Sequence, residues 1–111
     1  MSLLPLPVTS ADRESCEATY VLRRVGEKWS VLILVILGEG PMGFNELDRT
    51  VEGLSRRILT RTLRGLESDG LISRTPAADR MEYALTDSGQ SLLPLIVALG
   101  EWAIEHARHR R

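Results

Sequence analysis

Four arginines and one threonine share one side of a short segment, SRRILTRTLRGLESDG, at residues 55–70. Set at about 100° per residue, they fall within roughly 140° of arc on a helix, and they are Arg56, Arg57, Thr60, Arg61 and Arg64. Arginine carries a planar fork of donors that bonds phosphate oxygens, or the O6 and N7 atoms of guanine in pairs. The pattern fits either a nucleic-acid contact or a plain solvated surface, and the surrounding elements must decide between them.

The opposite side of the same segment is apolar, with Ile58, Leu59, Thr62, Leu63 and Leu66. Ser55 stands where an N-cap hydroxyl accepts a free N–H of the first turn, and it could also touch a phosphate. Gly70 stands where a left-handed C-cap belongs. We therefore expect a short, well-terminated helix with one apolar side and one arginine side.

Length and composition predict a single globular domain. The chain has 111 residues, of which 43% are hydrophobic, enough for a real core. No apolar run approaches the roughly 18 residues of a membrane span, and no basic stretch precedes an apolar one at the N-terminus. A single cysteine rules out an internal disulfide framework and suits a reducing compartment. We expect a cytoplasmic protein.

Positive charge gathers in the middle of the chain, although the net charge is −1. Residues 55–80 hold six arginines against three acids, whereas residues 1–54 hold five basic residues against eight acids and residues 81–111 three against four. Local potential matters more for nucleic-acid binding than the sum of charges. The charge distribution therefore favours a basic patch centred on the arginine helix.

The residues before the arginine helix are also predicted to be mostly helical. We expect a flexible arm over residues 1–11, a helix over about 12–25, and an almost wholly apolar, buried helix over about 28–37. Met42 to Phe44 is an extended link, and Asn45 then resembles the N-cap of a short helix to about Val51. Two short helices joined by a turn with glycine predict a helix-turn-helix, whose second helix enters the major groove. Lys28, opening the apolar helix, could reach the DNA backbone or stay exposed without a ligand.

The elements after it predict a β-hairpin and a long helix. Residues 71–75 and 81–85 alternate as strands around a turn at residues 76–80, which makes a hairpin of the kind called a wing. Thr86 caps a last helix that runs to about Ala107, and residues 108–111 form a basic tail. The fold class is mainly α with a small hairpin (α+β), a winged helix-turn-helix domain over residues 12–107.

The sequence resembles the HxlR-type winged-helix regulators, relatives of the MarR type, over about residues 16–104. The resemblance rests on GEKWSVLILVILGEGPMGFNEL, LSRRILTRTLRGLESDGLISR and MEYALTDSGQSLLPLI. It implies a homodimer on a palindromic operator, with the arginine helix in the major groove and the wing at the flanking minor groove. Gly43 stands where a basic residue often precedes the phenylalanine, and Glu17 where proline often follows the cysteine. The wing tip has Asp79 instead of proline, leaving Arg80 to reach the minor groove.

These expectations assign roles along the arginine helix and at the first helix. Residues in the first two turns of a recognition helix usually face base edges, so Arg56, Arg57, Thr60 and Arg61 are expected near bases and Arg64 at a phosphate. The resemblance also suggests that Cys16 senses oxidants or electrophiles. Flanking acids oppose the thiolate that this requires, and a lone cysteine is often a small buried hydrophobe. With one cysteine per chain, only an intersubunit bridge, a mixed disulfide or an adduct is open to it.

The last helix carries an apolar stripe that is either core packing or a dimer interface. We favour a two-fold dimer, because a helix projecting from a domain of this size has little core left to cover. Its expected residues are Tyr20 of the first helix and Leu92, Leu95, Ile96, Leu99, Trp102 and Ala103 of the last.

No enzyme chemistry is recognisable. His106 and His109 stand near the basic end without a supporting ligand cluster, so we expect no metal and no cofactor. The remaining alternative to a DNA-binding regulator is a winged helix used as a protein–protein interaction module, whose arginine face would dock an acidic partner.

Overall fold

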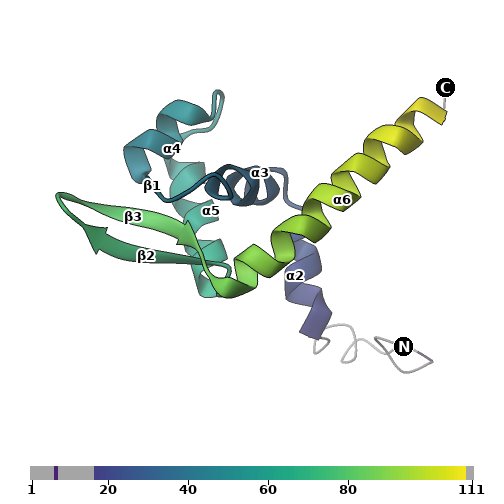
Figure 1. The fold of residues 1–111 in the computed structure, drawn as a ribbon, viewed down its shortest axis with the longest axis horizontal. Coiled ribbons are helices and arrows are strands. Elements are labelled where there is room, and N and C mark those ends of the chain that lie inside the picture. The colour runs from purple at the N-terminus through teal and green to yellow at the C-terminus, as the bar shows by residue number, and fades with distance from the viewer. Residues whose placement is uncertain (1–6, 8–16, 110–111) are drawn as a thin grey trace.

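The computed structural model describes residue 7 and residues 17–109, as five helices and one small sheet. Figure 1 shows their arrangement, with the order α2 (Glu17–Val25), α3 (Lys28–Leu37), β1 (Met42–Gly43), α4 (Phe44–Thr50), α5 (Arg56–Ser68), β2 (Ile72–Ala77), β3 (Arg80–Leu85) and α6 (Asp87–His109). The expected arm at residues 1–11, apart from residue 7, lies outside the described residues, as do residues 12–16 of the first expected helix. The predicted winged helix-turn-helix order is confirmed.

The three strands form an antiparallel sheet in the order β1-β3-β2. In the hairpin, Ala77 pairs with Arg80, so the turn holds only Ala78 and Asp79. The five-residue turn expected at 76–80 was therefore wrong. A two-residue hairpin turn needs a positive φ, which Ala78 supplies at +35°. Pro76 fits within β2 because this is an edge strand, where a missing N–H costs no ladder bond on the open side.

The core lies where α3, α4, α5 and the base of the hairpin meet. It is built from aliphatic side chains, among them Ile33, Leu34 and Leu37 of α3, Leu47 of α4 and Leu59, Leu63 and Leu66 of α5. The predicted burial of the 28–37 helix on nearly every side was wrong, because Leu32 and Val35 stay 37% and 41% exposed. That helix packs through one side only, and the described elements leave the side bearing Leu32 and Val35 open.

The first helix of the helix-turn-helix begins two residues earlier than expected. Gly43, and not Asn45, is the N-cap of α4. Its N–H donates to Oε1 of Glu46 at 3.2 Å, which satisfies a free donor at the point where β1 ends. Leu47 and Val51 face inward as predicted. The helix is therefore fixed to the sheet by its own first turn.

Both predicted ends of the arginine helix are confirmed. The Ile58 N–H donates to Oγ of Ser55 at 3.1 Å. At the other end Gly70 takes a left-handed φ of +76°, and the N–H groups of Gly70 and Leu71 return to the carbonyls of Glu67 and Leu66, both at 3.0 Å. This double return is the Schellman ending that glycine permits.

The last helix is fixed at its start and projects at its end. The Thr86 hydroxyl donates to the Gly70 carbonyl at 2.6 Å and accepts the Gly89 N–H at 3.2 Å, which joins the cap of α6 to the end of α5. From there α6 runs away from the domain, on the side opposite the hairpin (Figure 1). Within the described residues, no helix combines the length and apolarity needed to cross a membrane.

Candidate nucleic-acid interface

A row of three arginines lies along the outer side of α5. Arg57, Arg61 and Arg64 are exposed, while Leu59, Thr62, Leu63 and Leu66 of the same helix are buried. None of the three arginines forms an ion pair or hydrogen bond with another described side chain. We call Arg57, Arg61 and Arg64 the arginine row. It presents three guanidinium groups whose donors are free for an incoming anion.

Arg56 and Thr60 belong to the same predicted set, but both already have partners within the helix-turn-helix. Nη1 of Arg56 is 2.9 Å from Oδ2 of Asp48, and the guanidinium lies over the Phe44 ring at 4.7 Å from its centre. The Thr60 hydroxyl donates to the Arg56 carbonyl at 2.9 Å. The Arg56 contacts join α5 to α4, whereas the Thr60 hydrogen bond lies within α5. Sequence patterning grouped Arg56 with the arginine row, but the structure separates them.

Arg80 is held at the base of the wing tip by two carboxylates. It pairs with Glu46 of α4 and with Glu82, whose Oε2 is 2.9 Å from Nη2. The Gly43 N–H bond, with help from Arg80, holds the pKa of Glu46 below its usual range. The hydrogen bond that Arg80 donates to the Glu82 carboxylate is the largest cause that raises the pKa of Arg80. Arg80 therefore ties the wing to α4.

Lys28 and Ser55 stand at the starts of two helices. The Lys28 ammonium is exposed and lies 4.5 Å from the centre of the Trp29 ring, with no described carboxylate partner. Ser55 is exposed while its Oγ accepts the Ile58 N–H. Both residues are exposed, so a contact with the DNA backbone and a plain surface position both stay open for Lys28, as does a plain capping role for Ser55.

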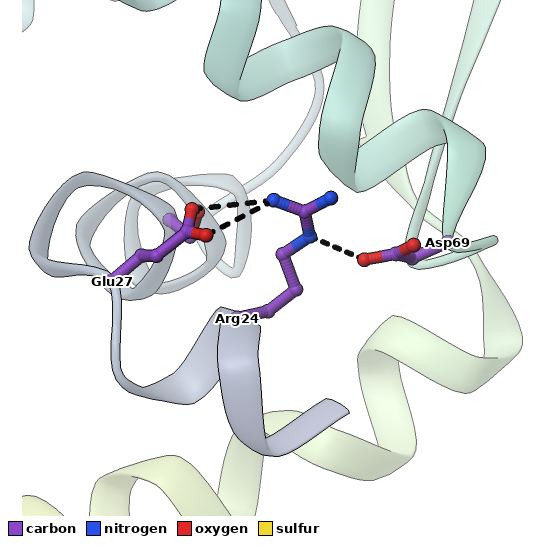
Figure 2. A network of polar contacts seen from close by, with 4 residues as sticks. Arg24, Glu27 and Asp69 are labelled. Carbon is purple, nitrogen blue, oxygen red and sulfur yellow. Dashed lines mark hydrogen bonds and ion pairs between the residues drawn. The ribbon is translucent and has the colours of Figure 1, made fainter. Parts of the chain in front are cut away.

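Arg24 is a residue that sequence reasoning missed. It reaches from the last turn of α2 to Asp69 at the end of α5, and its Nη1 is 3.2 Å from Oε2 of Glu27 (Figure 2). The guanidinium lies against Gly65, where an added Cβ would come within 2.9 Å of the Arg24 Cζ. The hydrogen bond to Asp69 raises the pKa of Arg24. The available signal was Gly65, a glycine in the interior of an otherwise well-patterned helix.

Leu95, Leu99 and Trp102 of the expected dimer residues are exposed on α6, whereas Ile96 is only 6% exposed and packs in the core of its own domain, with Leu92 partly buried against it. Leu92, Leu95, Ile96 and Leu99 of α6 line a shallow groove of about 240 Å³ with Val21, Leu22 and Val25 of α2. Leu95 is 67% exposed and Trp102 is 61% exposed, its ring stacked on His106 with centres 4.6 Å apart. Tyr20 is in α2, but its side chain is not among the described ones, and Cys16 lies outside the described residues.

Three comparisons place this arrangement among known proteins. The family model for the HxlR-like helix-turn-helix matches residues 24–111. An HTH-type transcriptional regulator of Methanothermobacter thermautotrophicus is 38% identical over 102 residues, which cover 89% of this chain and 78% of the relative.

Two solved structures have the same fold. The redox regulator HypR in its reduced form has a TM-score of 0.71 at 31% identity, covering 79% of this chain and 90% of its own. The reduced form of the regulator YodB from B. subtilis has a TM-score of 0.73 at 26% identity, with the same two coverages. The fold is a helix-turn-helix with an exposed arginine row and a wing. Together with the family match and these relatives, it shows that the chain belongs to the HxlR-like helix-turn-helix family of DNA-binding transcriptional regulators.

Proposed function

We propose that this regulator binds a specific, near-palindromic DNA operator as a homodimer, with α5 of each subunit in the major groove. The observation that carries the proposal is the arginine row, three exposed guanidinium groups without described carboxylate partners on the second helix of a helix-turn-helix. Unpaired guanidinium groups suit phosphates and guanine edges, which both accept two parallel N–H bonds.

The three residues of the arginine row contact different parts of the DNA, according to their positions along α5. Arg57 and Arg61 are in the first two turns and contact base edges, whereas Arg64, one turn further, contacts a phosphate. Ser55 and Lys28 contribute backbone contacts from the starts of α5 and α3.

The remaining predicted contacts require a rearrangement on binding. Arg56 reaches a base only by leaving Asp48, with Thr60 beside it, and Arg80 reaches the minor groove only by leaving Glu46 and Glu82. Their ion pairs make them weaker candidates than the arginine row. We therefore assign Arg56 and Arg80 to the edges of the operator, where their contacts form after the arginine row has bound the DNA.

Dimerisation is assigned to the apolar surface of α2 and α6. Exposed leucines and a tryptophan at helical spacing, such as Leu95, Leu99 and Trp102, form a surface that a second copy can cover about a two-fold axis. The two α5 helices would then lie about 34–36 Å apart, one turn of B-DNA. The two-fold axis of the dimer gives the operator its two-fold symmetry, and this spacing sets the distance between its half-sites.

Selection of bound duplexes from a random library tests the operator directly. We expect an enriched sequence whose two halves are inverted repeats about 10–10.5 base pairs apart. Failure to enrich any sequence, while the protein still binds random duplex, would leave a non-specific DNA-binding protein and contradict the proposal. No affinity for random duplex even at low salt would instead favour the protein–protein module, since DNA-binding proteins keep a non-specific electrostatic affinity.

A redox response through Cys16 is the second part of the proposal, for a protein that works in the reducing cytoplasm. It is supported by the similarity to HypR, which is named as a redox regulator. Peroxide would oxidise the Cys16 thiolate to a sulfenic acid, which loses water on condensing with a low-molecular-weight thiol or with the partner's Cys16 thiol. Operator affinity measured before and after peroxide, in wild type and Cys16→Ser, tests this. Full affinity of the oxidised wild type would make Cys16 structural.

A further inference from the structure

Arg24 is attached to the last turn of α5 at two points. Its guanidinium pairs with the Asp69 carboxylate, and it lies against Gly65, where an added Cβ would come within 2.9 Å of its Cζ. Asp69 is the C-cap of α5, and its N–H donates to the Gly65 carbonyl at 3.0 Å. Both attachment points therefore belong to one turn of backbone, and Arg24 fixes the end of the helix as a unit.

The same guanidinium is fixed on its other side to the start of α3 (Figure 2). Nη1 of Arg24 is 3.2 Å from Oε2 of Glu27, the residue that precedes α3. This oxygen also accepts the Ser30 hydroxyl at 3.0 Å, and Ser30 is fully buried in α3. Because the Glu27 carboxylate is bonded in turn, it cannot follow a displaced Arg24 freely. One chain of polar contacts thus joins α2, α3 and α5.

Backbone packing alone leaves α2 and α5 weakly connected. α2 packs against α3, and α5 packs against α3 and β2, whereas close approach between α2 and α5 themselves is sparse. The ion pair of Arg24 with Asp69 spans this gap, with both side chains mostly buried. Burial shields such a pair from salt, so the connection persists at physiological ionic strength. Arg24 therefore supplies a connection between the two helices that packing does not.

The angle between α2 and α5 determines how far apart the two arginine rows lie in the proposed dimer. α2 belongs to the surface assigned to dimerisation, so the two-fold axis relates the α5 helices through it. Any change of this angle in one subunit is repeated in the other and enters the separation twice. Moving a half-site by one base pair shifts it by about 3.4 Å and rotates it by about 34–36° around the duplex. A modest displacement of α5 therefore changes which spacing of half-sites fits.

We propose that Arg24 is a positioning residue for operator binding: it fixes the last turn of α5 to α2 and thereby determines which half-site spacing the dimer accepts. The effect on spacing rests on the dimeric operator proposed above, whereas the fixed position of α5 within one subunit does not. Arg24 acts through Gly65 and Asp69, and no contact with DNA is required of it. Loss of the attachment should therefore relax the choice of spacing and leave the affinity for a single half-site unchanged.

The distance between two spin labels in one chain, measured without DNA, tests the attachment. Arg23→Cys in α2 and Glu67→Cys in α5, both at exposed positions, carry the labels in a Cys16→Ser background. An excess of unlabelled protein restricts the signal to distances within single chains. We expect one narrow distance distribution, which Gly65→Ala broadens about twofold or more. Gly100→Ala, at a helical glycine with open space around it, should leave the distribution unchanged. A broad distribution before Gly65→Ala, or one that stays narrow after it, would overturn the proposal.

Operators with altered spacing test the consequence for DNA binding. The duplexes carry two selected half-sites at the selected spacing, or with one or two base pairs inserted or removed at the centre, and a further duplex carries one half-site. Wild type and the control Arg23→Ala should bind each altered duplex at least tenfold more weakly than the selected one. Arg24→Ala and Gly65→Ala should lose less than threefold, with an affinity for the single half-site within twofold of wild type.

Gly65→Ala separates this role from destabilisation and from altered charge, because it breaks the attachment while every charged group stays in the chain. A protein that is merely destabilised would bind all duplexes more weakly by the same factor, the single half-site included. That result in Gly65→Ala, or discrimination between spacings as strong as in wild type, would overturn the positioning role. A wild type that binds all spacings equally would instead overturn the dimeric operator together with the spacing role, while the label distances still decide whether Arg24 fixes α5.

Discussion

Arg24 and Asp69, 45 residues apart in the sequence, form an ion pair that joins the last turn of α2 to the C-cap of α5. Both side chains are mostly buried, with 19% and 15% of their surface exposed. The pair connects the helix assigned to dimerisation with the helix assigned to DNA. It therefore fixes where α5 lies relative to any second subunit.

Replacing Arg24 with alanine should destabilise the fold. The change leaves the Asp69 carboxylate without its partner in a mostly buried place, which costs about 1–3 kcal/mol. Arg23→Ala removes an exposed arginine one position earlier and should change stability by less than about 0.5 kcal/mol. Urea unfolding of both variants measures the difference. Equal free energies of unfolding for the two would show that the ion pair contributes nothing.

The effect of Gly65→Ala on the free energy of unfolding should depend on whether Arg24 is present. In wild type the new Cβ collides with the Arg24 guanidinium and displaces it from Asp69, which cancels the gain of alanine over glycine in a helix. In Arg24→Ala the collision is gone, so the same substitution should stabilise by about 0.5–1 kcal/mol. A double-mutant cycle by urea unfolding gives both values. Identical effects in the two backgrounds would mean that Gly65 has no role in seating Arg24.

Glu46 should make stability depend on pH in the acid range. Its pKa is lower in the folded protein than in the unfolded chain, because the Gly43 N–H and Arg80 favour the carboxylate. This contribution is complete above the unfolded pKa, near 4.3, and is lost as pH falls through the folded pKa. Glu46→Gln keeps an oxygen for Gly43 and loses the charge. The stability gap between wild type and this variant should shrink from pH 7 to pH 3, and a constant gap would contradict the assignment.

The proposed dimer surface predicts the effect of a misplaced charge. Leu95→Glu puts a carboxylate in the centre of the apolar groove between α2 and α6. Burial of an unpaired charge in an interface is strongly unfavourable, so the variant should be a monomer. Gln90→Glu adds the same group on the opposite side of α6 and should leave the dimer intact. Light scattering after size exclusion measures both masses, and a dimeric Leu95→Glu would move the interface elsewhere.

Local signals allowed the helix-turn-helix to be predicted. The Ser55 cap, the Gly70 ending and the 3.6-residue periodicity of α5 depend on neighbouring residues only, and all three are confirmed. The turn at Ala78 was misjudged because strand pairing extended β2 through Pro76. The start of α4 was misjudged because Gly43 gains its partner from Glu46 while ending β1.

The state of each arginine depends on distant residues and could not be predicted. Arg56 and Arg61 look alike in the sequence, but only Arg56 has Asp48 within reach, across the turn between two helices. The ion pair of Arg24 with Asp69 could not be predicted, because Asp69 is 45 residues away in the sequence and comes close only when α2 and α5 are packed together. Sequence periodicity predicts on which side of a helix a residue lies. Which charged residues form ion pairs depends on how the helices pack together.

The central claim is that the arginine row of α5 holds DNA. Anisotropy titrations of a labelled operator duplex at several salt concentrations test it in Arg57→Ala/Arg61→Ala, with Arg23→Ala as the control. We predict a loss of about 2–6 kcal/mol for the double variant, together with relaxed base preference at the positions that Arg57 and Arg61 contact, with the control unchanged. A double variant that keeps wild-type affinity within twofold would contradict the claim.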